Sequence, residues 1–274
     1  MRNNKLKLTV ITTMIIMAIL VAPLRAHDEV KNSTVALGNM LGSAVSTLLK
    51  GIIQGKVKNI GDAGKMLLYG GAAGYGFYTA KNMMSKGNIF TGVMMANLSA
   101  SISENSSWGE NPLAYIGYTL GPARVRIATP LAKEKRGIIN VHVSAKELVN
   151  LVYAFANSDR VMFKNGLFTF ESDKGMDNGA IGWTKGVFAT TMTGTPEYVK
   201  NHEMVHVVQN LQLASVSMYE PFMNRDYSSK SNKLFHFEGI KLDLFSFAND
   251  LANTAISYES RWDEIEAHHF ATSK

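Results

Sequence analysis

Hydrophobic and polar positions follow three different patterns along the chain. Residues 8–24 carry no charge, and residues 31–105 are rich in small and apolar side chains in runs that Gly, Lys or Asn interrupt. Small residues at helical spacing let helix backbones approach closely. This stretch therefore predicts two or three helices that pack together or lie against a membrane, each interrupted before it reaches spanning length. After Gly109 the runs become short, β-branched and aromatic, which predicts strands.

Individual elements can be placed in the second half of the chain. Ser144 followed by Glu147 fits a capping box with apolar residues at helical spacing behind it, so a helix is expected there. Residues 160–170 read RVMFKNGLFTF, and Asn-Gly favours the tight turn of a β-hairpin. Residues 182–191 are expected to form one further strand. Strands that lead into a helical last third predict an α+β fold.

The uncharged run near the N-terminus has the features of an export signal. Arg2, Lys5 and Lys7 precede it and the small residue Ala26 follows it, as in a secretory signal peptide. We expect residues 1–26 to be a signal peptide cleaved after Ala26. An uncleaved anchor is the alternative, although 17 uncharged residues are slightly few for a membrane span. Either way the rest of the chain is expected in the periplasm or outside the cell, or associated with the membrane.

Charge and cysteine content narrow the classes of function. The formal net charge is +6, but four of the 28 basic residues and none of the acidic ones lie in residues 1–26. The mature chain then has 24 basic and 22 acidic residues, which removes the main support for nucleic-acid binding. The absence of cysteine excludes disulfides, thiolate metal sites and a cysteine nucleophile. A metal ion in this chain would need His and carboxylate ligands.

Residues 202–206 read His-Glu-Met-Val-His, in a segment that is expected to be helical. On a helix His202 and His206 lie one turn apart on one face, where they can supply two ligands to a tetrahedral zinc ion. Glu203 is rotated by about 100° from His202, so it flanks the metal in the position of a general base. The sequence therefore predicts a hydrolytic zinc site.

The residues around this motif support a buried helix. Thr195 is a good N-cap and Pro196 suits the first helical position. Met204, Val208 and Leu211 occupy the face opposite the two histidines and are expected to pack into the domain.

A zinc enzyme needs a third protein ligand as well as an open position. Position 212 is Gln212, so the third His of the metzincin pattern is absent. The remaining source is an acidic residue near the C-terminus, where the sequence YESRWDEIEAHH contains Glu259, Glu264 and Glu266.

The HEMVH helix followed by EIEAH resembles the active-site helices of the gluzincin class of zinc metallopeptidases, which includes thermolysin-like and CAAX-prenyl-protease-like enzymes. In the second group the ligand stands in a pattern E-x-x-A-D, which implies Glu264 as ligand and Ala267 as the small residue. His268 departs from the final Asp, which would orient a zinc-bound His. A thermolysin-like Glu-Ala pair implies Glu266 instead. Glu264 and Glu266 point about 200° apart, so only one can bind; we choose Glu264, with Glu259 as a third alternative.

The resemblance implies a zinc-dependent endopeptidase with a peptide or protein substrate. The expected organisation is a signal peptide (1–26), a Gly/Ala/Met-rich helical region with peripheral membrane contact (27–110), and an α+β zincin-like domain with a small sheet (111–274). The rival hypothesis is a non-enzymatic envelope or membrane-associated binding protein whose HExxH helix is inactive.

Other residues have a functional and a structural interpretation. Gln209 shares the His202 face and could orient a ligand, or be solvated. His236 and Tyr258 could polarise a substrate carbonyl, although a structural role is expected more for both, as it is for His142. The strand at 182–191 could pair with an extended peptide.

Overall fold

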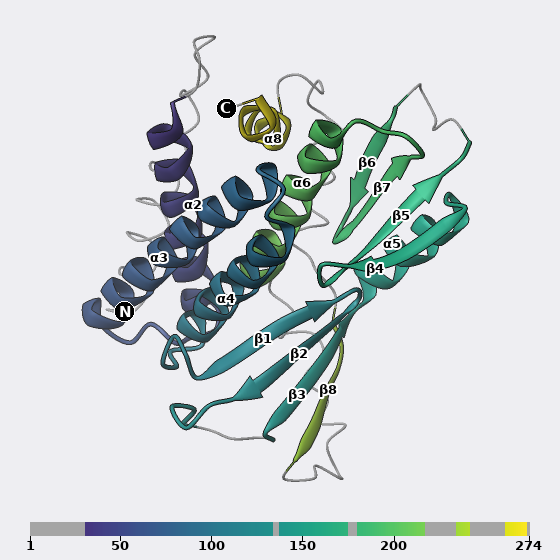
Figure 1. Ribbon diagram of the computed structural model, residues 1–274. Helices are drawn as coiled ribbons and strands as arrows, with labels where there is room; N and C mark the ends of the chain where they lie inside the picture. The colour runs from purple at the N-terminus through teal and green to yellow at the C-terminus, as the bar shows by residue number, and fades with distance from the viewer. Residues whose placement is uncertain (1–30, 134–136, 175–179, 217–233, 242–260, 273–274) are drawn as a thin grey trace.

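The computed structural model shows an α+β protein in which three N-terminal helices and two four-stranded sheets surround a central helix (Figure 1). It describes residues 31–133, 137–174, 180–216, 234–241 and 261–272. The signal peptide and cleavage site expected in residues 1–26 lie outside these ranges, as do Tyr258 and Glu259.

Helices α2 (Asn32–Ile53), α3 (Ile60–Ser85) and α4 (Ile89–Ser107) form the predicted small-residue bundle. A Cβ added to Gly70 would lie 2.8 Å from the Cα of Ala44, and one added to Gly74 would overlap the Asn39 carbonyl. The small residues therefore do let the backbones of α2 and α3 approach closely.

Among the described helices, α2 alone is long and apolar enough to cross a membrane by length and composition. It lies near the N-terminus and 39% of its apolar window is buried inside the protein. A core helix would have the same composition, so this observation is weak evidence for a span.

The first sheet contains strands β1 (Tyr115–Leu120), β2 (Ala123–Ala128), β3 (Ile139–Ser144) and β8 (Phe235–Lys241), in the order β1-β2-β3-β8. We call it sheet A. β1, β2 and β3 are antiparallel neighbours, and β8 adds in parallel to β3. Helix α4 lies on one side of sheet A, where Glu104 forms an ion pair with Arg124 at 2.9 Å.

Helix α5 (Ala145–Ala156) confirms the predicted N-cap, because the Ser144 side chain accepts a hydrogen bond from the Glu147 backbone amide. The reciprocal half of the box is replaced, since the Ser144 amide donates to the Pro122 carbonyl. Strands β4 (Arg160–Lys164) and β5 (Leu167–Ser172) form the predicted hairpin around Asn165 and Gly166.

The prediction of one strand over 182–191 is wrong. The segment forms two antiparallel strands, β6 (Gly182–Lys185) and β7 (Phe188–Met192). Gly186 has φ +61° at the turn, and the carboxylate of Glu147 accepts a hydrogen bond from the Val187 amide. The second sheet, sheet B, has the order β4-β5-β7-β6, so β6 is an edge strand.

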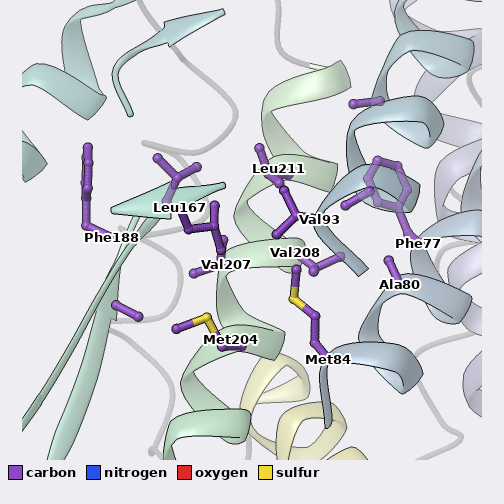
Figure 2. Packing of buried hydrophobic residues seen from close by; sticks show 14 of the residues in the cluster. Phe77, Ala80, Met84, Val93, Leu167, Phe188, Met204, Val207, Val208 and Leu211 are labelled. Atoms are coloured by element: carbon purple, nitrogen blue, oxygen red, sulfur yellow. The ribbon is translucent and has the colours of Figure 1, made fainter. Parts of the chain in front are cut away.

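Helix α6 (Glu197–Val216) carries the HExxH motif through the middle of the molecule (Figures 1 and 2). Met204, Val208 and Leu211 pack into the main core as predicted. Figure 2 shows the side chains of α6 between those of sheet B and those of α3 and α4. Val205 packs into a second cluster with Val35, Ala267 and Phe270. The helix is therefore covered on several sides.

The first turn of α6 forms around Pro196 as predicted, and the Thr195 side chain bonds to the segment before β6. The Pro196 carbonyl accepts hydrogen bonds from the amides of Val199 and Lys200, so the first turn forms around it. The Thr195 hydroxyl donates to the carbonyl of Ile181 at 3.0 Å, which fastens the start of the helix to sheet B.

The short helix α8 (Trp262–Thr272) lies beside α6 near the N-terminal end of α2 (Figure 1). The fold is therefore α+β, as expected. Because the main core joins α3 and α4 to α6 and sheet B, it crosses the boundary proposed at residue 110. Two separate domains at that boundary stay a prediction.

Candidate metal centre

Three potential ligand atoms converge where α8 crosses α6. Nε2 of His202 lies 3.1 Å from Nε2 of His206, and both lie 3.4 Å from Oε2 of Glu264. These residues form a group that could hold a metal ion, the only such group of three or more among the described residues. A tetrahedral zinc ion with bonds of about 2.0–2.1 Å separates its ligand atoms by about 3.3–3.4 Å. The observed triangle has nearly these edges.

The tautomer of His206 follows from its neighbour Gln209. The Gln209 amide nitrogen donates to Oε2 of Glu266 at 2.7 Å and to the Asp263 carbonyl at 2.9 Å, and both of these are acceptors. The amide oxygen therefore faces Nδ1 of His206 at 2.7 Å and accepts its proton. In the neutral ring this leaves a lone pair on Nε2, directed into the triangle.

Glu264 is held through one oxygen and directs the other at the two imidazoles. Arg261 donates from Nη2 to Oε1 of Glu264 at 2.5 Å, whereas Oε2 is the oxygen that faces the two imidazoles. A carboxylate oxygen and the Nε2 lone pairs repel one another at such distances unless a proton or a cation is shared between them. The two imidazole nitrogens and the carboxylate oxygen therefore suit a divalent cation that binds both nitrogen and oxygen ligands.

The charges around His206 also favour a cation at this position. Burial of the ring disfavours its protonated form, but the nearby Glu264 and Glu203 carboxylates, together with the Gln209 hydrogen bond, outweigh burial and raise the pKa of His206. The surroundings thus attract positive charge to this position.

Glu266, the alternative ligand, lies outside the triangle. Its carboxylate accepts hydrogen bonds from Lys81 of α3 at 2.7 Å, from Gln209 and from Asn39 of α2. Burial disfavours its charge, but Lys81 and these hydrogen bonds outweigh burial and lower the pKa of Glu266. Lys81 also donates to Gln212 at 2.9 Å. Glu266 thus anchors a buried network behind His206, and Glu264 is the acid that faces the motif.

Glu203 is buried between α6 and β6. Thr184 donates from its hydroxyl to Oε2 of Glu203 at 2.7 Å, and Oε1 lies 3.0 Å from where a Cβ on Gly182 would be. Burial raises the pKa of the Glu203 carboxyl, and the charges of His206, His202 and Glu264 also act on it. A carboxylate with a raised pKa next to these potential metal ligands is suited to act as a general base.

The remaining candidates lie elsewhere. His268 is exposed, so the residue that departs from the family pattern does not face the cluster, and Gln209 contacts His206 instead. His236 and His142 are buried on sheet A, where His142 lies 3.5 Å from Glu238. Neither belongs to the metal group.

Sequence reasoning missed three contributors, Lys81, Thr184 and Arg261. Arg261 precedes Glu264 by one helical turn, a spacing that allows the ion pair. Nothing in the sequence indicates that Lys81 or Thr184 reaches the site, because both contacts join distant elements. Comparison of the chain with protein-family models, with curated proteins and with solved structures finds no match.

Proposed function

We propose that this protein is an exported zinc-dependent endopeptidase of the gluzincin type, with a zincin-like catalytic domain. His202, His206 and Glu264 would hold the zinc ion, and Glu203 would be the general base. The observation that carries the proposal is the triangle of His202 Nε2, His206 Nε2 and Glu264 Oε2, with edges of 3.1 and 3.4 Å beside a buried carboxylate.

A zinc ion at this position would polarise a substrate carbonyl and lower the pKa of a bound water to about 7. Glu203 takes the proton from the attacking water and returns it to the leaving amine. Thr184 fixes Oε2 of Glu203 and thereby sets the direction of Oε1. Gln209 holds the His206 ring by Nδ1, and Arg261 holds Glu264 by Oε1.

The edge strand β6 supports a peptide substrate. It borders α6 at the position of Glu203, since Thr184 of β6 bonds to that residue. An extended peptide that adds to β6 through main-chain hydrogen bonds would pass close to the cluster. Such binding would be directed mainly at the backbone, with side-chain preferences set by alternate residues.

The test combines metal content with turnover. The purified protein should contain about one zinc ion per chain, and His206→Ala should lose it. Glu203→Gln should keep the zinc and lose most cleavage of an unfolded protein substrate. Asn210→Ala is the control and should keep both zinc and cleavage. In the part of the chain that the structure describes, the Asn210 side chain bonds only to the backbone carbonyl of His206 on its own helix.

Other outcomes separate the alternatives. Absence of metal after refolding with zinc would favour the non-enzymatic envelope protein. Stoichiometric zinc with full cleavage by Glu203→Gln would remove Glu203 from the role of base. Stoichiometric zinc without any peptide cleavage would leave the metal centre and reject the endopeptidase.

A further inference from the structure

The two faces of sheet A have opposite compositions. Residues paired across neighbouring strands share a face, so the register of the four strands assigns every side chain to one of the two. On one face each residue is apolar or aromatic; we call it the apolar face. Its members are Ile116, Tyr118, Leu120, Ala123, Val125, Ile127, Ile139, Val141, Val143, Phe235, Phe237 and Ile240.

The other face of sheet A carries the charges. Arg124 and Arg126 of β2 lie there with His142 of β3 and Glu238 of β8. This polar face is directed at α4, because Arg124 pairs with Glu104. Sheet A is therefore inverted relative to an ordinary two-layer packing, in which the apolar face covers the core.

The apolar face is open in the single chain. None of its residues is buried. Tyr118 reaches the β4–β5 turn, where its hydroxyl donates to the Gly166 carbonyl. The most open side chains are 39–52% exposed: Ile116, Leu120, Ile127, Phe235, Phe237 and Ile240.

We propose that the apolar face binds the same face of a second copy of this chain. No charged side chain lies on it, so two copies meeting across a two-fold axis bring no like charges together. Two sheets packed in this way lie about 10 Å apart with interdigitating side chains.

The exposed area of the apolar face is compatible with the interface of such a dimer. Six large side chains, each exposed by about two-fifths to a half, leave roughly 500 Å² of apolar surface, and the half-buried Val125, Ile139, Val141 and Val143 add to it. A patch of this size lies in the upper part of the range of about 300–600 Å² for the largest apolar patch on a monomer, and the half-buried residues bring it closer to the about 800 Å² per partner of a stable interface.

A lipid bilayer fits the same face less well. Among the described strands β1 and β8 are the edges of sheet A. Side chains of α4 complete the hydrogen bonds of β1, because Ser101 and Asn97 accept from the amides of Gly117 and Thr119, so only β8 is an edge without a described neighbour on its outer side. Open sheet edges do not occur within the hydrocarbon of a membrane, because their backbone groups would lose hydrogen bonds. A second sheet covers the apolar side chains without changing the surroundings of the strand edges.

The first test is the oligomeric state of the full chain in solution. Wild type should sediment as a dimer, and Ile127→Lys should weaken association at least tenfold. Because Ile127 is 52% exposed, the lysine should leave the melting temperature of the monomer nearly unchanged. Val152→Lys on α5 is the matched control, because Val152 is also apolar and exposed but lies outside sheet A, and it should still dimerise.

A second test does not depend on tolerance of a lysine. The chain has no cysteine, so a single Val125→Cys or Val141→Cys is the only thiol present. At a sheet separation of about 10 Å a direct disulfide is too short, but a bismaleimide of similar length spans the gap. We expect at least one of these variants to give cross-linked dimers, and Val152→Cys to give none.

Several results would overturn the proposal. These are a wild type that stays monomeric up to about 100 µM, an Ile127→Lys variant that dimerises as wild type does, and equal cross-linking at Val125, Val141 and Val152. Flotation with phosphatidylglycerol vesicles that Ile127→Lys abolishes in a monomeric protein would assign the face to lipid instead.

Discussion

Gln209 connects His206 to Glu266: its carbonyl oxygen lies 2.7 Å from Nδ1 of the imidazole, and its amide nitrogen lies 2.7 Å from the carboxylate. Because Glu266 is in turn bonded to Lys81 on α3, the N-terminal helices help to fix the ring of a proposed zinc ligand. The orientation of this candidate metal ligand thus depends on residues more than a hundred positions away in the sequence.

Replacing Gln209 with Ala should weaken zinc binding about 10- to 100-fold, because the His206 ring loses the acceptor that fixes its tautomer and direction. Competition against a chelator of known affinity measures the change. Gln212→Ala is the matched control, since Gln212 belongs to the same buried network but accepts from Lys81 and donates to Ser43, with no contact to His206. Equal losses in the two variants would contradict the positioning role of Gln209.

Replacing Lys81 with Met should lower the free energy of unfolding by about 3–5 kcal/mol, because the carboxylate of Glu266 is left buried without its cation. Urea denaturation followed by circular dichroism measures it. The double variant Lys81→Met/Glu266→Met should be more stable than Lys81→Met, since it removes the stranded charge. A single variant as stable as wild type would show that the ion pair is not needed for the fold.

Gly182→Ala should reduce turnover while zinc content stays the same. A Cβ at this position would lie 3.0 Å from Oε1 and 3.1 Å from Cγ of Glu203, so the carboxylate has to move. A Cβ at Gly64 of α3 meets nothing within 4 Å, and Gly64→Ala should therefore keep full activity and gain about 0.5–1 kcal/mol of stability. Unchanged kcat in Gly182→Ala would argue against Glu203 as the base.

Stability should fall in acid partly through His142. Burial of its ring and the nearby Lys241 ammonium lower the pKa of His142 to about 3, against about 6.5 in an unfolded chain. Between these values the unfolded state binds the proton and the folded state does not. The free energy of unfolding therefore decreases by about 1.4 kcal/mol per pH unit as the pH falls below about 6.

His142→Gln should flatten this dependence between about pH 6 and pH 4. Urea titrations at several pH values, compared with the exposed-site variant His268→Gln, test it. If the slopes of wild type and His142→Gln coincide, the ring does not stay neutral in the folded protein.

The sequence predicts local features of this fold well. The Ser144 cap, the Asn165–Gly166 turn and the helix over residues 202–206 all follow from residues within a few positions of one another. The close approach of α2 and α3 also follows from composition alone. The segment 182–191 was predicted wrongly because Gly186 was not taken as a turn residue, although its φ of +61° suits glycine.

Features that join distant segments were not predictable. Strand β8 pairs in parallel with β3, almost a hundred residues earlier, and nothing near Phe235–Lys241 in the sequence indicates that partner. The choice between Glu264 and Glu266 likewise depended on which side of α8 meets α6. The deciding fact is Lys81, whose buried ammonium binds Glu266 and leaves Glu264 to face the histidines.

The inversion of sheet A illustrates a further limit of pattern reasoning. Alternation along β2 and β3 predicts that one face is apolar, but it does not say whether that face meets the chain's own core. The partner of the polar face is Glu104 on α4, a helix whose sequence gives no sign of a buried acid.

The shared core of α3, α4 and α6 determines how the protein can mature. Phe77, Met84 and Val93 cover the side of α6 that holds Met204 and Val208 (Figure 2). Proteolytic release of these helices would expose that side to water and strand the Glu266 carboxylate. Removal of the helical half would therefore open the core, and we expect processing that leaves a folded protein to stop before α2.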